Sequence, residues 1–201
     1  MSRHFKVELS TGVIDIYDGY VPWRLRDATW EYLTKECGWF LGWQDGVGLD
    51  SHLHAVVDKA MPTTHDILGS VSDDERFKER MKGHKLGIVV ANLSHPASIH
   101  HRHTHPQQLG MIYYANLEWQ HGWEGETFFY DKEGEVEYCS SYVPGRILLF
   151  DSQMSHSIRA QSPIGPPARF TVSYFWDYYG EENEKMVENL GEESGGEGRG
   201  D

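Results

Sequence analysis

The chain has 201 residues, of which 39% are hydrophobic and 13% aromatic, and its formal net charge is -13. This length allows one substantial hydrophobic core and is short for two, so we expect a single domain. The sequence contains no basic stripe, and its negative charge would repel a polyanion, which argues against a nucleic-acid partner. It also contains no run of about eighteen apolar residues, so a membrane partner is not expected.

The amino terminus and the two cysteines indicate a reducing, cytoplasmic setting. The first residues are polar and lack the apolar stretch of a secretion signal. Cys37 and Cys139 lie far apart and form no CxxC pair, which argues against a thiolate metal site and against a disulfide scaffold. We therefore expect both to be ordinary buried thiols.

The first part of the chain predicts strands followed by a helix. Residues 5–17 alternate between apolar and polar types and are interrupted at Thr11 and Gly12, which predicts one or two strands. Pro22 is expected to open a helix that runs to about Glu36, because apolar residues repeat there at spacings of three and four. This apolar stripe predicts that the helix lies on a sheet.

The segment between this helix and residue 85 predicts less regular structure. Residues 39–48 are rich in glycine and aromatic residues, which indicates a loop or short strands. Residues 72–75 read Ser-Asp-Asp-Glu, the pattern of a capping box, and predict a short helix that ends near Gly83.

From residue 85 onward the pattern is that of β structure. Short apolar runs alternate with turns rich in Gly, Pro, Asp and Ser, and no helical period intervenes. The predicted strands span residues 86–93, 109–117, 126–130, 135–142, 146–150 and 169–176. We therefore predict a mainly β (α+β) domain over residues 1–179, a jelly roll with N-terminal supporting helices. Residues 180–201 are rich in Gly and Glu with few apolar residues, which predicts a disordered acidic tail.

Four histidines gather in the seven residues from Ile99 to His105. On a strand, His101, His103 and His105 would point to one face and His100 to the other, because successive side chains alternate. Neutral imidazole is a common ligand for iron, zinc, copper and nickel, and histidines two apart can take adjacent positions around a metal. The alternative to a metal site is an ordinary histidine-rich surface loop.

Two later residues strengthen the metal interpretation. His156 follows the predicted strand at residues 146–150, and a jelly roll can bring it next to the histidine stretch. Arg169 begins the last predicted strand, where its guanidinium can pair bidentately with a carboxylate. Each residue alone is compatible with a surface histidine or a strand-edge cation, so their order along the chain carries the argument.

Several sequence words lie in order between residues 92 and 176, namely Tyr113-Tyr-Ala-Asn-Leu-Glu-Trp119, Gly125-Glu-Thr-Phe128, Pro144-Gly-Arg-Ile-Leu-Leu-Phe-Asp151, His156 and Arg169-Phe-Thr-Val-Ser173. With them this part of the chain, under half of its length, resembles the catalytic core of the iron(II)- and 2-oxoglutarate-dependent dioxygenases, in their prolyl 4-hydroxylase-like branch. The resemblance implies a double-stranded β-helix that uses Fe(II), 2-oxoglutarate and O2. It also implies that Arg169 binds 2-oxoglutarate, with Thr171 and Tyr114 as hydrogen-bond partners of the carboxylate.

One position departs from the family pattern. The family's first ligands are a His-x-Asp or His-x-Glu pair, whereas the pair at the matching distance from Tyr113 is His103-Thr-His105. His105 in place of the carboxylate would give a three-histidine site with His103 and His156. In a slipped register His101 and His103 would bind instead, and in a third account the fold has lost its iron. The retained aromatic and basic residues of the cofactor pocket argue against loss of the iron, and the distance to Tyr113 favours the first account.

The reaction that the resemblance implies oxidises 2-oxoglutarate to succinate and CO2 and hydroxylates a substrate, either a small molecule or a peptidyl residue. Aromatic residues at 39–43, Trp119 and Trp123 are candidates for the rest of the pocket. Two other function classes stay open. A three-histidine jelly roll also resembles the cupin dioxygenases, which need no keto-acid, although Arg169 argues against them. A non-catalytic ligand-binding jelly roll would make the histidines incidental.

Overall fold

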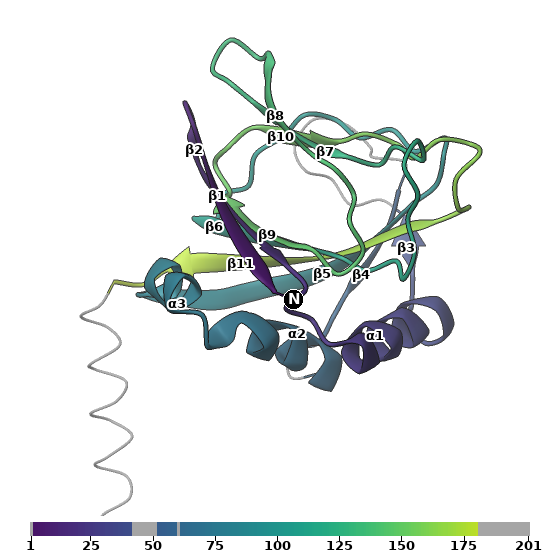
Figure 1. Cartoon of the computed structure of the whole chain (residues 1–201), viewed down its shortest axis with the longest axis horizontal. Coiled ribbons are helices and arrows are strands. Elements are labelled where there is room, and N and C mark those ends of the chain that lie inside the picture. Colours follow the sequence, from purple (N-terminus) through teal and green to yellow (C-terminus); the bar gives the residue numbers. More distant parts are fainter. Residues whose placement is uncertain (1, 42–51, 60, 181–201) are drawn as a thin grey trace, which may run out of the picture.

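Two antiparallel sheets face each other, and helices cover the outer face of the larger sheet (Figure 1). A computed structural model describes residues 2–41, 52–59 and 61–180. The elements are β1 (Arg3–Leu9), β2 (Gly12–Asp18), α1 (Trp23–Lys35), β3 (Phe40–Leu41), β4 (Leu53–Val56), α2 (Pro62–Ser72), α3 (Glu75–Met81), β5 (His84–Ser94), β6 (Leu109–Tyr114), β7 (Thr127–Tyr130), β8 (Val136–Ser140), β9 (Ile147–Asp151), β10 (His156–Ile158) and β11 (Arg169–Tyr178).

The order of the strands is that of a jelly roll, as predicted. Within the described residues the larger sheet has eight strands in the order β1-β2-β9-β6-β11-β5-β4-β3, and the smaller has three in the order β10-β7-β8. Neighbouring strands are mostly distant in sequence: β11 pairs with β5 on one side and with β6 on the other. The predicted tail at residues 180–201 falls outside the described residues except for Gly180.

The larger sheet is covered on both faces. Every residue of β6 is buried, which requires a layer on each side because successive side chains point to opposite faces. Along β11, Phe170, Val172 and Tyr174 pack into the core below the helices. Residues Arg169 and Thr171 alternate with them and therefore point between the two sheets. One face of β11 therefore packs in the core, and the other face, which carries Arg169 and Thr171, can bind a ligand.

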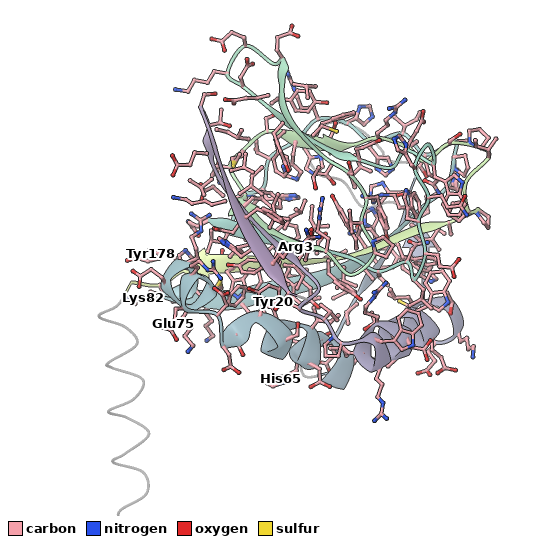
Figure 2. All side chains as sticks on the ribbon, in the orientation of Figure 1. Arg3, Tyr20, His65, Glu75, Lys82 and Tyr178 are labelled. Atoms are coloured by element: carbon pink, nitrogen blue, oxygen red, sulfur yellow. The ribbon has the colours of Figure 1, made fainter. Side chains whose placement is uncertain are left out.

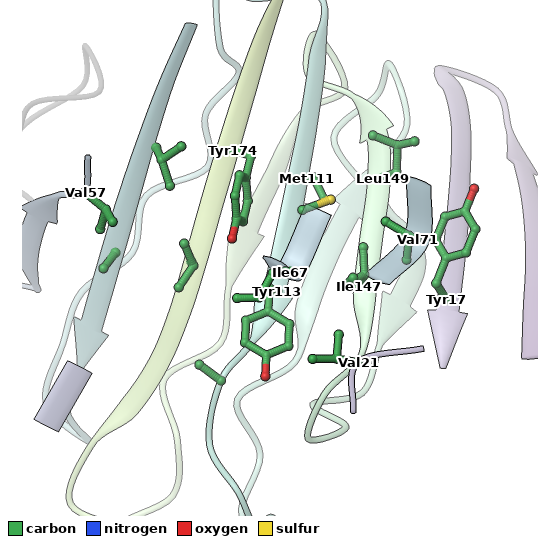
Figure 3. Close-up of a cluster of buried hydrophobic side chains, with 14 of the residues drawn as sticks. Tyr17, Val21, Val57, Ile67, Val71, Met111, Tyr113, Ile147, Leu149 and Tyr174 are labelled. Carbon is green, nitrogen blue, oxygen red and sulfur yellow. The ribbon is translucent and has the colours of Figure 1, made fainter. Parts of the chain in front are cut away.

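The core between helices and sheet is apolar and fully enclosed. Figure 3 shows Ile67 and Val71 of α2 beside Met111, Tyr113 and Leu149 of the central strands. Burial of each large apolar side chain contributes roughly 1.5–3 kcal/mol, so this layer supplies much of the driving force that holds the sheet in place.

The outer surface of the helical layer is polar. His65, Glu75 and Lys82 are exposed and are labelled on this side of the molecule in Figure 2. Among the described residues no helix is long and apolar enough to cross a membrane.

Several predictions of strands and helices are confirmed, and two local predictions, a helix cap and the burial of the cysteines, are wrong. Residues 5–17 form the hairpin β1-β2, whose strands are separated at Ser10 and Thr11. The predicted short helix is present as α3 and ends at Met81, near Gly83, but its predicted cap is wrong. Ser72 ends α2, and Asp74 caps α3 by accepting a hydrogen bond from the Arg76 backbone N–H at 3.0 Å. The buried-thiol prediction is also wrong, since Cys139 is exposed and Cys37 is half-buried.

Three elements were not predicted from the sequence, namely β4, α2 and β10, whereas β3 lies in the segment for which a loop or short strands were expected. The strands β3 and β10 have two and three residues, too few for a periodic signal. Strand β4 matters for the site, because it lies between β3 and β5 in the larger sheet and places His54 opposite Asn92 of β5.

Candidate metal centre and carboxylate pocket

His103 and His156 lie opposite each other in an antiparallel bridge. The His103 N–H donates to the His156 carbonyl and the His156 N–H donates to the His103 carbonyl, each at 3.0 Å. Residues directly opposite in an antiparallel pair present their side chains on the same face. The backbone therefore holds the two imidazoles together, with ring centroids 4.5 Å apart.

His105 lies two residues beyond His103 and joins the same face. Its backbone N–H donates to the Ser152 carbonyl at 2.9 Å. Its ring centroid is 4.8 Å from that of His103 and 5.1 Å from that of His156. In the part of the chain that the structure describes, these three histidines each offer one ligand atom, and the three atoms lie within 4.8 Å of one another.

Backbone carbonyls orient two of these rings. His103 Nδ1 donates to the carbonyl of His101, and His156 Nδ1 donates to the carbonyl of Met154, each at 2.8 Å. A carbonyl oxygen only accepts, so Nδ1 carries a proton, and in the neutral ring the lone pair is then on Nε2. A hydrogen bond of this kind orients a histidine ligand and raises its basicity.

The third ring is neutral, as a metal ligand must be. Burial, and secondarily the neighbouring His103, lowers the pKa of His105 to about 3. By contrast His101, which the slipped register would use, is exposed and is not a member of this group. The structure thus brings together His103, His105 and His156, the set in which a histidine takes the carboxylate's position.

A cavity of about 430 Å³ opens beside the three histidines. This volume lies in the range of small-molecule pockets, which is about 300–1,000 Å³. Ile112 and Ser173 line the cavity, and each is two residues from a predicted cosubstrate ligand, Tyr114 on β6 and Thr171 on β11. Tyr114, Thr171 and Arg169 are buried and are not among the residues that line the cavity.

Arg169 is fully buried at the start of β11. Its Nε donates to the Gly125 carbonyl at 3.0 Å, whereas Nη1 and Nη2 have no hydrogen-bond partner among the described residues. Burial lowers the pKa of Arg169, because the charged form loses its hydration. A buried guanidinium is stabilised when a carboxylate pairs with it, so these two nitrogens fit an incoming carboxylate.

Thr171 and Tyr114 lie opposite each other where β11 pairs with β6. The Thr171 Oγ1 is buried and has no hydrogen-bond partner among the described residues. The Tyr114 hydroxyl already bonds to Thr127 Oγ1 at 2.7 Å, and burial raises its pKa, so it stays a phenol. The Arg169 guanidinium carbon lies 5.6 Å from the centre of the Tyr114 ring.

Gly125 begins one of the sequence words that carry the resemblance, but the sequence alone assigned it no role in this pocket. Its φ is +84°, and a Cβ at this position would lie 2.8 Å from the Trp119 ring and 3.4 Å from Arg169 Cδ. Glycine adopts this backbone conformation readily, whereas other residues rarely do. Gly125 therefore allows the chain to pass beside Arg169 and offer its carbonyl to Nε.

The aromatic residues proposed for the pocket have structural positions instead. The Trp39 ring packs against Phe170 in the core below the helices, with centroids 5.7 Å apart. The Trp119 ring packs on Tyr142 at 4.1 Å. Neither residue, nor Trp123, lines the cavity. Phe40 of β3 is exposed and does not line the cavity either, and Trp43 lies outside the described residues.

No family model matches the chain, and no curated protein sequence matches it. Solved structures match it by fold. A prolyl hydroxylase from Trichoplax adhaerens, in complex with a peptide fragment of the hypoxia inducible factor oxygen degradation domain, has a TM-score of 0.64 and 14% identity, and the match covers 89% of this chain and 87% of that one. A prolyl-4-hydroxylase from Pseudomonas putida has a TM-score of 0.59 and 14% identity, with 86% and 96% covered.

A third match has a different ligand. HygX from Streptomyces hygroscopicus, with nickel, 2-oxoglutarate and hygromycin B bound, has a TM-score of 0.60 and 10% identity, with 84% of each chain covered. At these identities the likeness concerns the fold. The chain has the jelly-roll fold of prolyl hydroxylases and of other 2OG-Fe(II) oxygenases.

Proposed function

We propose that the chain is an oxygenase that uses Fe(II), O2 and 2-oxoglutarate to hydroxylate a small molecule or a peptidyl residue, forming succinate and CO2. The observation that carries this proposal is the buried Arg169, whose Nη1 and Nη2 have no partner among the described residues, on the inner face of a sheet that also lines a three-histidine group. A metal site alone does not need a buried guanidinium. A dicarboxylate that binds the metal at one end and Arg169 at the other uses both.

The proposed roles follow from this arrangement. His103, His105 and His156 hold Fe(II) through neutral ring nitrogens, while Arg169 pairs with the far carboxylate of 2-oxoglutarate. Thr171 donates a hydrogen bond from its hydroxyl to the same carboxylate, and Tyr114 is a second hydrogen-bond partner of that carboxylate. Bound Fe(II) supplies the oxidising chemistry, in which O2 and the keto-acid are consumed. The protein orients the cosubstrate and keeps water away from the guanidinium, which strengthens the ion pair.

The substrate belongs to one of two groups. The solved structures of similar fold include one with a peptide fragment bound and one with hygromycin B bound. These ligands support a peptide and a small molecule respectively as the kind of substrate for this chain.

The three-histidine group also fits a cupin-type dioxygenase that needs no keto-acid. Both proposals predict iron binding, but they differ in what Arg169 does. A cupin-type reaction leaves Arg169 buried without a carboxylate, which is costly. We therefore favour the 2-oxoglutarate-dependent reaction.

Anaerobic titration of the full chain with Fe(II) and 2-oxoglutarate tests the proposal. A visible charge-transfer band should appear only when both are present, and His156→Ala should abolish it. His121→Ala, which removes an exposed histidine elsewhere on the surface, is the matched control and should retain the band. Substrate-driven O2 uptake without 2-oxoglutarate would establish the cupin-type reaction instead, and absence of iron binding would establish a non-catalytic jelly roll.

A further inference from the structure

A second group of histidines lines the cavity, and the proposed metal site does not use it. His52 and His54 lie at β4 and His100 lies just before the metal-site histidines, yet all three line the same cavity. The ring of His52 is 4.0 Å from that of His54 and 4.6 Å from that of His100. Histidines buried in a core usually have purely structural partners. Such a role does not explain why these three line a cavity, and we refer to His52, His54 and His100 as the wall.

The His54 ring is held in one orientation by its neighbours. His54 Nδ1 bonds to Asn92 Oδ1 at 2.9 Å, and Asn92 Nδ2 donates to Ser173 Oγ at 3.1 Å. Because an amide oxygen only accepts, the His54 ring donates from Nδ1 and carries its lone pair on Nε2. The chain of bonds crosses β4, β5 and β11, so this part of the wall is preorganised before any ligand arrives.

The wall is uncharged. Burial, together with the neighbouring histidines and Arg169, lowers the pKa of His52 to about 3 and that of His100 to about 2. Among the described residues that line the cavity there is no Asp, Glu, Lys or Arg. A charged group placed there would have no counter-charge from these residues, and burial of an unpaired charge costs several kcal/mol.

The wall can still form hydrogen bonds. A neutral imidazole has one donor and one acceptor nitrogen. The Nε2 of His100 is buried and has no hydrogen-bond partner among the described residues. A buried polar atom without a partner is destabilising, so a ligand that bonds to it gains affinity over one that does not.

We propose that His52, His54 and His100 recognise the substrate and select an uncharged group that both donates and accepts hydrogen bonds, an amide or a hydroxyl. The inference rests on the proposed function in taking the three-histidine metal face as the reacting centre. It narrows the part of the substrate that contacts these histidines to an uncharged polar group, and a peptide and a small molecule can both supply an amide of this kind.

Binding to the Zn(II)-loaded full chain with 2-oxoglutarate present tests the selection without turnover. The probes are matched sets: N-acetylated dipeptide amides and the same dipeptides with a free carboxylate or amine, and small polyols and amides with their acid and amine analogues. Ligand-observed NMR at millimolar concentration should show binding of uncharged members and at least about tenfold weaker binding of charged ones. The dipeptide and small-molecule arms distinguish the two sources of the group.

Two substitutions at His100 separate hydrogen bonding from shape. His100→Phe keeps an aromatic ring but removes both polar nitrogens, and it should weaken the uncharged probes about tenfold. His100→Gln restores a donor and an acceptor and should recover most of that loss. His52→Phe serves as a second variant, and His65→Phe, on the outer face of the helical layer in Figure 2, is the matched control that should bind like the wild type.

The outcomes distinguish this inference from the proposed function. If the wild-type protein shows no charge-transfer band with Fe(II) and 2-oxoglutarate, the proposed function is wrong. The relative affinities of the charged and uncharged probes still test the proposed selection by His52, His54 and His100. If the band is present and charged probes bind as well as uncharged ones, or no uncharged probe binds, the inference is wrong. Equal binding by His100→Phe and wild type also overturns it. Two metal ions per chain, falling to one in His100→Phe, would make the wall a second metal site instead.

Discussion

Replacement of Arg169 by methionine should affect 2-oxoglutarate binding and apo stability in opposite directions. Methionine fills most of the volume of the arginine stem but carries no charge. In the protein without cosubstrate, Arg169 bears the cost of a buried guanidinium whose Nη1 and Nη2 have no partner among the described residues. We therefore expect Arg169→Met to leave the free energy of unfolding unchanged or to raise it, as replacement of buried charges by apolar residues often does.

The effect on the cosubstrate should be large. Loss of a desolvated charge partner costs about 2–5 kcal/mol, which corresponds to roughly 30-fold to several-thousand-fold weaker 2-oxoglutarate binding. At a concentration of about 100 times Kd, 2-oxoglutarate adds about 2.7 kcal/mol of stability to the wild type, or about 5–10 °C in Tm. At the same concentration the variant should lose at least about two thirds of this increase, and nearly all of it at the upper end of the range.

Thermal unfolding of the Zn(II)-loaded protein with and without 2-oxoglutarate measures both effects. Arg146→Met is the matched control, because Arg146 bonds to both carboxylate oxygens of Asp18, at 2.7 and 2.8 Å. This control should have a lower Tm but a normal increase with 2-oxoglutarate. A normal increase in Arg169→Met would refute the assignment of Arg169 to the cosubstrate.

Three further predictions concern the histidines and the glycine. His105→Asp should still bind Fe(II) and 2-oxoglutarate, His105→Ala should bind iron more weakly, and His101→Ala should bind iron almost as the wild type does. The iron content of the three variants, measured by metal analysis, tests this prediction. A fully iron-replete, active His105→Ala would contradict the three-histidine assignment. Gly125→Ala should destabilise the fold by about 1–3 kcal/mol in urea unfolding, since its Cβ would lie 2.8 Å from a neighbouring indole. Burial lowers the pKa of His52 to about 3 and of His100 to about 2 from 6.5, so below about pH 6.5 the unfolded chain binds more protons than the folded one. The unfolding free energy of the metal-free protein should then fall between pH 7 and 5 by up to about 1.4 kcal/mol per pH unit for each group, and a flat pH profile would contradict the neutral wall.

The strands of the jelly roll were predictable because their sequences carry strong local patterns. The run from Arg169 to Trp176 is rich in β-branched and aromatic residues, and alternation alone separates Arg169 and Thr171 from the core residues between them. Helix α2 was not predictable in the same way. Its sequence, Pro-Thr-Thr-His-Asp-Ile-Leu-Gly-Ser-Val-Ser, contains Gly and several residues of low helix propensity, so its helical form depends on packing under the sheet.

The site was predictable only in part, for a related reason. Spacing alone placed His101, His103 and His105 on one face, and the choice of His103 and His105 rested on their distance from Tyr113 in the family pattern. Their pairing with His156 depends on a bridge between segments 53 residues apart. No local pattern connects His52 and His54 with His100. Their meeting is a product of the order of strands in the sheet, which periodicity does not reveal.

The three ring nitrogens of the metal face come from neutral imidazoles, two of them fixed by backbone carbonyls. Such a donor set is ready before an ion arrives, and it has no anionic oxygen to favour a harder metal. Affinity should then follow the Irving–Williams order, in which nickel and copper bind more tightly than ferrous iron. Iron occupancy would depend on the supply of each ion when the chain folds, so correctly folded but mismetallated molecules would be inactive. Protein produced in media of different metal content should differ in its bound metal, and equal iron content in all of them would count against this dependence.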